Sequence, residues 1–275
     1  KRNLMVSATL VALVAILAGG VQESCSSPED AGTLRLLLVR HAESENNVLN
    51  LVSKDHYVEN RHSDPDITEL GTEQAQEAAR FICASRTGLM RHLTEVRISP
   101  TLRTLQTARP FASRLSGVRM VVDSEIFEAG GVYERCPQTG DVVAFPGLTK
   151  EDMAVYGYEL PPEVTSKGWN TIQGKESRDA AKSRALRVAE RLRAEAAEQK
   201  NGMTRAIALV SHGDFIGFLL SHLIGTDLSR VNMHVWNTAM TCVDLHSDGS
   251  VTLNFFNSVA HLRSDQYRQS QLGNV

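Results

Sequence analysis

Five charged or titratable side chains in this sequence each follow a short apolar run that is typical of a buried strand. They are Arg40, His41, Arg103, Glu128 and His212. In open α/β sheets, ligands bind outside the carboxyl ends of the strands. We therefore expect these side chains to meet at one edge of one sheet, although they are far apart in the chain.

Two arginines, two histidines and a carboxylate match the needs of phosphoryl transfer. A guanidinium presents a planar fork of donors that fits phosphate oxygens, and it keeps its charge near neutral pH. A histidine can be neutral and nucleophilic near pH 7, and neighbouring guanidinium groups lower its pKa further. A glutamic acid with a raised pKa can protonate a departing alcohol oxygen. The set predicts phosphoryl transfer through a covalent phosphohistidine.

Apolar runs that alternate with helical patterns predict the elements that position these residues. The predicted strands cover residues 34–39, 95–99, 118–122, 205–210, 241–245 and 251–256. The predicted helices cover residues 72–84, 102–115, 177–199 and 215–223. Thr72 is expected to be the N-cap of the first helix, and Pro110 is expected to break or kink the second. The segment 247–250 (SDGS) is a hairpin signal between the last two strands.

Alternating strands and helices predict an α/β fold, specifically a three-layer α/β/α sandwich. Its sheet should be mostly parallel with an antiparallel edge. We expect this domain to cover residues 34–262, with a polar tail at 263–275.

The segments that carry the five side chains resemble those of the histidine phosphatase superfamily, in its phosphoglycerate mutase-like branch. The similar segments are VRHAESENN (39–47), DPDITELG (64–71), SPTLRTLQTA (99–108), IFEAGG (126–131) and SHGDF (211–215). The resemblance implies that His41 is the phosphorylated nucleophile and that Arg40 and Arg103 bind the phosphate. It also implies that His212 binds the transferring phosphoryl group and that Glu128 is the general acid, which later activates water.

Residues near the two histidines extend the resemblance. Asn47, six positions after the nucleophile, fits an asparagine that touches the bound phosphate, and Ser44 and Gly213 are further predicted substrate-binding residues. Asp214 could donate the proton in place of the predicted glutamic acid. Ala42 stands where mutases have glycine, which disfavours a mutase.

The resulting hypothesis is a phosphatase that hydrolyses phosphate monoesters by double displacement. One alternative is a mutase of the phosphoglycerate type, which returns the phosphate to a second hydroxyl of the same sugar acid. Another is a non-catalytic scaffold that binds phosphorylated ligands. The substrate can be a phosphorylated small molecule or a phosphoprotein, and the sequence leaves the oligomeric state open.

Residues 129–174 are rich in glycine and proline, with no lasting periodicity. Long irregular segments of this kind are often functional, so we expect this lid-like excursion to cover the pocket. Its candidate substrate contacts are Tyr133, Arg135, Phe145, Tyr156, Tyr158 and Trp169.

Residues 1–33 differ from the rest, with an apolar run at 4–21 after a basic start. The run has the length of a membrane span and also fits a cleavable signal peptide. We expect a leader that directs the chain to the secretory pathway or anchors it in a membrane. The alternative is a cytoplasmic protein.

Composition excludes several classes of protein. The chain of 275 residues carries 29 Lys and Arg against 32 Asp and Glu, a net charge of −3, which argues against nucleic-acid binding. Its 4 cysteines lack C-x-x-C spacing, which argues against a zinc ribbon or a disulfide-dense scaffold. The remaining histidines lack the spacing of zinc ligands, so we predict neither a metal nor a cofactor. The histidines considered are His56, His62, His222, His234, His246 and His261.

Three other segments suggest chemistry but favour structural roles. Residues 64–68 (DPDIT) match the D-x-D-x-T of aspartyl-phosphate hydrolases, but no buried strand precedes them. We expect them to open the helix at Thr72. Cys83 lacks an arginine at phosphatase-loop spacing and is predicted to be a core residue. The Arg- and Glu-rich stretch 178–198 is predicted to be a solvated helix face.

Overall fold

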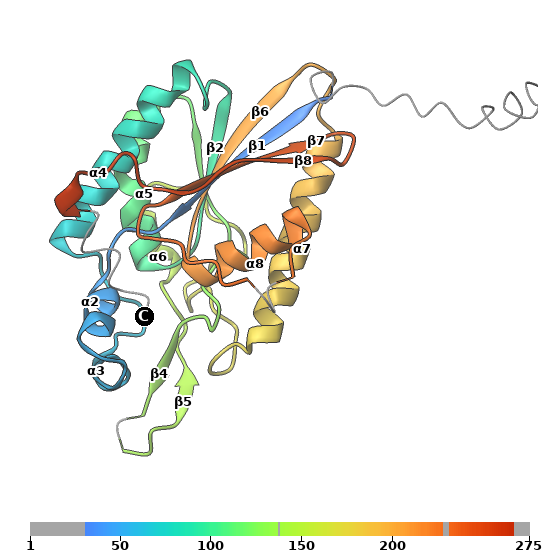
Figure 1. The fold of residues 1–275 in the computed structure, drawn as a ribbon. Coiled ribbons are helices and arrows are strands. Elements are labelled where there is room, and N and C mark those ends of the chain that lie inside the picture. Colours follow the sequence, from blue (N-terminus) through green and yellow to red (C-terminus); the bar gives the residue numbers. More distant parts are fainter. Residues whose placement is uncertain (1–30, 137, 228–230, 267–275) are drawn as a thin grey trace, which may run out of the picture.

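The computed structural model describes residues 31–136, 138–227 and 231–266, and Figure 1 shows a central sheet with helices on both sides. In this part of the chain, six strands form the sheet in the order β3-β2-β6-β1-β7-β8. They are β1 (Thr33–Arg40), β2 (Leu93–Ile98), β3 (Arg119–Val122), β6 (Thr204–Ser211), β7 (Met240–His246) and β8 (Val251–Ser258). Strands β3, β2, β6 and β1 pair in parallel in that order. Strand β7 is antiparallel to β1, and β8 is antiparallel to β7. The predicted α/β fold is confirmed.

Two pairs of helices form the outer layers. The helices are α2 (Glu45–Val52), α3 (Lys54–Asn60), α4 (Glu69–Ala84), α5 (Leu102–Arg114), α6 (Lys150–Ala154), α7 (Arg178–Ala197) and α8 (Gly213–Ile224), with a 3₁₀ turn at Ser85–Thr87. Helices α4 and α5 lie on one side of the sheet, and α7 and α8 lie on the other (Figure 1). A separate hairpin of β4 (Tyr133–Arg135) and β5 (Val142–Ala144) projects from the body of the domain.

Strand β1 shows why the sheet is covered on both faces. Leu34, Leu36 and Leu38 pack into the core beneath α7 and α8. Leu37 and Val39 face the opposite way and pack with α4 and α5. Because side chains alternate along a strand, only a continuous apolar run can fill both cores, and this is the pattern of a buried parallel strand.

The structure corrects the predicted N-cap of α4 and excludes a break at Pro110. Thr68, not Thr72, is the N-cap of α4, and its hydroxyl accepts a hydrogen bond from Gly71 N at 2.9 Å. Helix α5 continues through Pro110 instead of breaking there. Leu105 and Phe111 are fully buried on either side of this proline. Their packing holds both halves of the helix on the sheet and offsets the lost backbone hydrogen bond.

The excursion at 129–174 is more ordered than predicted. It contains the β4–β5 hairpin and α6, which begins with a capping box formed by Thr149 and Asp152. Met153 and Trp169 are buried in the core. Much of the excursion therefore completes the packing at one end of the sheet.

The predicted leader and tail lie largely outside the described residues. Of the range 1–33, only residues 31–33 are described, and Thr33 is the first residue of β1. Of the tail, residues 263–266 are described, and Gln266 is buried with its carbonyl 3.3 Å from Gln74 Nε2. In the described ranges, no helix has the length and hydropathy needed to cross a bilayer.

Gly71, in the first turn of α4, lies directly against the segment that follows His41. A Cβ at Gly71 would be 2.1 Å from Glu43 O. The same carbonyl accepts a hydrogen bond from Thr68 N at 2.9 Å. The start of α4 thus holds the segment after the predicted nucleophile, and only a residue without a side chain fits this approach.

Replacing Gly71 with alanine is expected to lower the free energy of unfolding by about 1–3 kcal/mol, because either the helix or the Glu43 segment must move. Denaturant unfolding monitored by circular dichroism would measure this loss. The matched control is Gly217→Ala within α8, where the added Cβ would meet Met233 Cβ at an ordinary 3.7 Å. That control should be neutral or slightly stabilising. Equal losses for the two variants would contradict the steric argument.

Candidate active site

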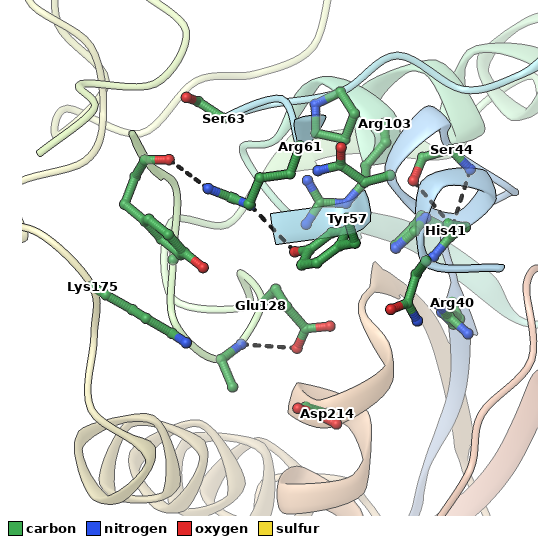
Figure 2. Close-up of a pocket in the computed structure, with 17 residues that line it drawn as sticks. Arg40, His41, Ser44, Tyr57, Arg61, Ser63, Arg103, Glu128, Lys175 and Asp214 are labelled. Atoms are coloured by element: carbon green, nitrogen blue, oxygen red, sulfur yellow. Dashed lines mark hydrogen bonds between the residues drawn. The ribbon is translucent and has the colours of Figure 1, made fainter. Parts of the chain in front are cut away.

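A pocket of about 340 Å³ opens where β1 and β6 end, and Figure 2 shows the side chains around it. The predicted site residues in its wall are Arg40, His41, Ser44, Asn47, Arg103, Glu128 and Asp214. His212 and Gly213 do not line the pocket but adjoin it. The ring centroids of His41 and His212 are 5.2 Å apart. A Cβ at Gly213 would lie 3.6 Å from Arg40 Nε.

The backbone fixes the tautomer of His41. Its Nδ1 lies 2.7 Å from Ala42 O, and a carbonyl can only accept, so Nδ1 carries the hydrogen. The lone pair of the neutral ring is then on Nε2. Burial lowers the pKa of His41 well below its usual range, and the charges of Arg103 and Arg40 lower it further. His41 is therefore a neutral imidazole with one available nucleophilic nitrogen.

His212 orients Arg103. Arg103 Nη2 donates to His212 Nδ1 at 3.0 Å, because a guanidinium has no acceptor. His212 Nε2 must then carry the hydrogen, which it donates to Ser99 Oγ at 2.8 Å. Burial lowers the pKa of His212 well below its usual range, with Arg103 as the next cause. The second histidine is thus also neutral.

Asp64 holds Arg103 from the other side. Its two carboxylate oxygens lie 3.1 and 3.0 Å from Leu102 N, and Oδ1 lies 3.4 Å from Arg103 Nη1. Burial raises the pKa of Asp64 to about 6, against the opposing effect of Arg103. The last residue of the 64–68 segment, Thr68, is the N-cap of α4, so the segment opens this helix as expected. Its first residue, Asp64, instead binds the first turn of α5.

Arg40 is the second cation beside His41. Its Nη1 donates to Val235 O at 2.6 Å, and the residue is buried. Burial lowers the pKa of Arg40 to about 10, so the group stays charged near neutral pH. Two fixed guanidinium groups beside one imidazole form a site for an anion.

Backbone donors hold Glu128 by one oxygen. Its Oε1 accepts from Ala129 N at 2.8 Å and from Phe215 N at 3.1 Å, and Oε2 remains toward the pocket. Burial raises the pKa of Glu128, and the negative charge of Asp214 raises it further. Asp214 also faces the pocket, but its side chain is 62% exposed, 3.9 Å from Arg178. The raised pKa makes Glu128 the stronger candidate for the proton donor.

Arg184 supports the segment that leads to Glu128. It donates to Glu125 O at 2.7 Å and Phe127 O at 2.9 Å, while two nitrogens pair with Glu176 at 3.0 and 2.7 Å. Its guanidinium centre lies 3.4 Å from the centroid of the Phe127 ring. The prediction that 178–198 is a solvated face is therefore wrong at Arg184, where a buried guanidinium satisfies carbonyl groups of the 125–127 turn.

Asn47 has a fixed orientation at the start of α2. Its Oδ1 accepts from Ser44 N and Ser44 Oγ at 3.0 Å each, and from Asn237 Nδ2 at 3.1 Å. Three donors around the oxygen leave the side-chain NH₂ as the group available to a ligand. The same Asn237 amide lies 3.1 Å from His41 O, so it also links α2 to the nucleophile.

The predicted substrate contacts of the excursion are mostly wrong. Of the six, Tyr133 alone lines the pocket. Trp169 and Tyr158 are buried in the core, where Tyr158 Oη donates to Leu105 O at 3.2 Å. Phe145 and Tyr156 pack against that core, and Arg135 lies exposed on the hairpin. Large aromatic side chains here cover the end of the sheet, which sequence composition does not distinguish from ligand contact.

Sequence reasoning missed a second group of pocket residues. It comprises Asn46, Asn50, Tyr57, Arg61, Ser63, Pro65, Ala129, Gly131 and Lys175. Several come from α2, α3 and the turn after them, where no element was predicted. The acidic and amide residues at 43–47 after a strand are a weak helix-start signal that could have indicated α2.

The other histidines and Cys83 remain apart from the pocket. His62 lies 3.8 Å from Glu45 Oε2 at the surface, and His261 lies 3.1 Å from Thr238 Oγ1. Cys83 packs at the margin of the core, near Arg114 O. Within the described ranges, no three His, Cys, Asp or Glu side chains form a group that could hold a metal ion.

Comparison with known proteins identifies relatives of this chain. The family model described as histidine phosphatase superfamily (branch 1) matches residues 36–258. A Schizosaccharomyces pombe protein named as a probable phosphatase is 26% identical over 245 residues, which are 87% of this chain and 75% of that protein.

Solved structures show the same fold. The mycobacterial glucosyl-3-phosphoglycerate phosphatase has a TM-score of 0.53 at 20% identity, covering 82% of this chain and 99% of the other. The ecdysone phosphate phosphatase of Bombyx mori has a TM-score of 0.53 at 16% identity, covering 79% and 91% respectively. At these identities the likeness establishes the fold alone.

The raised pKa of Asp64 predicts a pH-dependent stability. The pKa of this carboxyl group is about 6 in the folded protein, against an ordinary value of 3.8. The protonated group therefore contributes fully to the free energy of unfolding below about pH 4. As pH rises from about 4 to about 6, this group alone should reduce the free energy of unfolding by on the order of 2–3 kcal/mol. Asp64→Asn should flatten that part of the stability–pH curve, as measured by urea unfolding. Asp55→Asn, at an exposed aspartate on α3 that is not among the groups shifting the pKa of Asp64, is the control. An unchanged curve for Asp64→Asn would contradict the assignment.

Proposed function

The chain belongs to the histidine phosphatase superfamily, and from this premise we propose that it hydrolyses phosphate monoesters through a phosphohistidine on His41. The observation that carries the proposal is the state of His41. Its Nδ1–H donates to the carbonyl of Ala42, and its Nε2 is unprotonated beside the charges of Arg103 and Arg40. A nucleophile that stays uncharged beside an anion-binding pair suits attack on phosphorus.

In the first step, the phosphate of the ester binds between Arg40 and Arg103, with the Asn47 NH₂ as a further donor. His41 Nε2 attacks phosphorus in line, and the bond to the leaving oxygen breaks. Glu128 gives its proton to that oxygen, so the alcohol departs neutral and Glu128 becomes a carboxylate. Charge neutralisation and positioning supply most of what this transfer requires.

In the second step, a water molecule enters where the alcohol was. The Glu128 carboxylate accepts a proton from this water as its oxygen attacks phosphorus. The N–P bond breaks, the electron pair returns to His41 Nε2, and inorganic phosphate leaves. His212 acts on both steps because it positions Arg103 at 3.0 Å and contributes no charge of its own.

A hydrolase is favoured over the two alternatives. Ala42 stands where the mutases of the family have glycine, and the S. pombe relative is named as a phosphatase. A non-catalytic scaffold would not need a buried glutamic acid with a raised pKa beside a neutral histidine. Phosphorylated small molecules and phosphoproteins both fit the proposal.

The proposal predicts that His41→Ala lowers the release of nitrophenol from p-nitrophenyl phosphate by at least about a thousandfold, because no other group replaces the nucleophile. A chromogenic assay measures the rate. The wild type quenched in alkali after mixing with a radiolabelled ester should carry an acid-labile phosphate on His41. His92→Ala, at an exposed histidine, should behave as wild type. Label on another residue, or equal rates for His41→Ala and wild type, would refute the mechanism.

The shifted pKa values also predict the pH profile of kcat/KM for an alkyl phosphate, whose poor leaving group needs a proton. His41 stays neutral below its ordinary pKa of 6.5, so the acidic limb of the profile is displaced to lower pH. Glu128 stays protonated above its ordinary pKa of 4.5, and activity falls as pH rises through its raised pKa. Glu128→Gln should abolish this basic limb and lower the rate by roughly 10²–10⁴-fold.

Asp214→Asn separates the two candidate acids. Because the charge of Asp214 raises the pKa of Glu128, its removal should shift the basic limb to lower pH while activity persists. If Asp214 were the acid, this variant would instead lose both the basic limb of the pH profile and the activity on alkyl phosphates.

A further inference from the structure

Two cations line the pocket in addition to the proposed phosphate-binding arginines. They are Arg61, which follows α3, and Lys175, which precedes α7. Both lie near one aromatic ring, that of Tyr133: the Arg61 guanidinium centre is 3.9 Å from its centroid, and Lys175 Nζ is 5.5 Å from it. We call Arg61, Lys175 and Tyr133 the cationic rim.

Contacts within the protein already hold Arg61 in position. Its Nη1 donates to Tyr133 O at 2.9 Å, and its Nε donates to Tyr57 Oη at 3.3 Å. Its Nη2 makes no hydrogen bond to a described residue and remains as an oriented donor. A guanidinium fixed by two bonds and a stacked ring loses little conformational freedom on binding an anion.

The cationic rim carries an excess of positive charge. Within the described residues, neither Arg61 nor Lys175 forms an ion pair with a carboxylate. The carboxylates that line the pocket are Glu128, which is protonated in the proposed first step, and Asp214, which lies near Arg178. A single phosphate between the inner arginines would leave both rim cations uncompensated.

The direction of the reaction places the rim beside the leaving group. In-line attack by His41 puts the leaving oxygen on the far side of phosphorus, next to Glu128. The rest of the alcohol must then extend beyond Glu128. Figure 2 shows Arg40 and His41 on one side of Glu128 and Lys175 on the other, at the end of the pocket where the alcohol would lie.

We propose that Arg61 and Lys175 bind a second oxyanion on the leaving group, so that this enzyme acts on phosphate esters of anionic alcohols. The oxyanion is a carboxylate or a second phosphate, which present the same chemistry to a guanidinium and an ammonium. This inference rests on the proposed phosphatase function. Tyr133 positions both cations and covers one side of the alcohol.

A matched series of three-carbon esters tests the proposal. Propyl phosphate ends in a methyl group, 3-phosphonooxypropanoate ends in a carboxylate, and propane-1,3-diol bisphosphate ends in a phosphate. Release of inorganic phosphate gives kcat/KM for each, with a factor of two allowed for the two equivalent ends of the bisphosphate. Wild type should prefer at least one anionic ester by tenfold or more, and the preference should shrink at high salt. Which anionic ester is favoured identifies the source of the oxyanion.

The variants Arg61→Gln and Lys175→Gln should each reduce that preference by about fivefold to tenfold and leave kcat/KM for propyl phosphate within about twofold. Hydrolysis of the phosphoenzyme should not change, because the alcohol has already left. Lys175 is exposed, so its variant avoids the loss of packing that could accompany replacement of Arg61. Lys167→Gln, at an exposed lysine of the 129–174 excursion that does not line the pocket, is the control for net charge and should keep the full preference.

Equal kcat/KM for the three esters in wild type, or equal losses on all three in both variants, would overturn the inference and leave the phosphatase intact. Failure of the proposed function looks different: no ester would release phosphate and no phosphohistidine would form.

Discussion

One short hydrogen bond, from His41 Nδ1 to Ala42 O at 2.7 Å, sets the chemistry of the whole pocket. It places the hydrogen of the neutral ring on the side away from the ligand and leaves the lone pair on Nε2. Burial and two guanidinium groups keep the ring from taking up a second proton. In a solvated loop, by contrast, a histidine side chain would exchange between its two tautomers and be partly protonated near pH 6.5.

Contacts from several elements keep that backbone segment in place. His41 N donates to Ser211 O at 2.8 Å, and Ala42 N donates to Thr107 Oγ1 at 3.0 Å. The start of α4 approaches Glu43 so closely that Gly71 has no room for a side chain. The segment after β1 is thus connected to β6, α5 and α4, which come from three distant parts of the chain. Such cross-connection keeps a catalytic loop as rigid as the sheet that carries it.

Glu128, the proposed acid, is supported by the opposite layer of the fold. Arg184 on α7 satisfies the carbonyls of the turn before Glu128, and the first turn of α8 donates Phe215 N to its carboxyl group. The proposed nucleophile and the proposed acid are therefore held mainly by different helical layers, and the sheet fixes their separation. The pocket lies between the two supports, and the cationic rim extends it outward. This division explains how one site holds a neutral imidazole and a carboxyl group of raised pKa beside the same two guanidinium groups.

The sequence alone determined the six strands of the central sheet, because apolar runs of this length are typical of strands in a sheet covered on both faces. Their alternation with helices predicted mostly parallel pairing. Parallel pairing in turn brought the residues after each strand to one edge, so the chain order by itself predicted that Arg40, His41, Arg103, Glu128 and His212 lie together. Tertiary structure decided which side chains around them face the pocket. Arg184, Asp64 and Arg61 have the same charged character in the sequence as many surface residues. Arg184 is positioned by distant carbonyl groups, Asp64 by the start of α5, and Arg61 by an aromatic ring. Such long-range contacts leave no periodic pattern in the sequence.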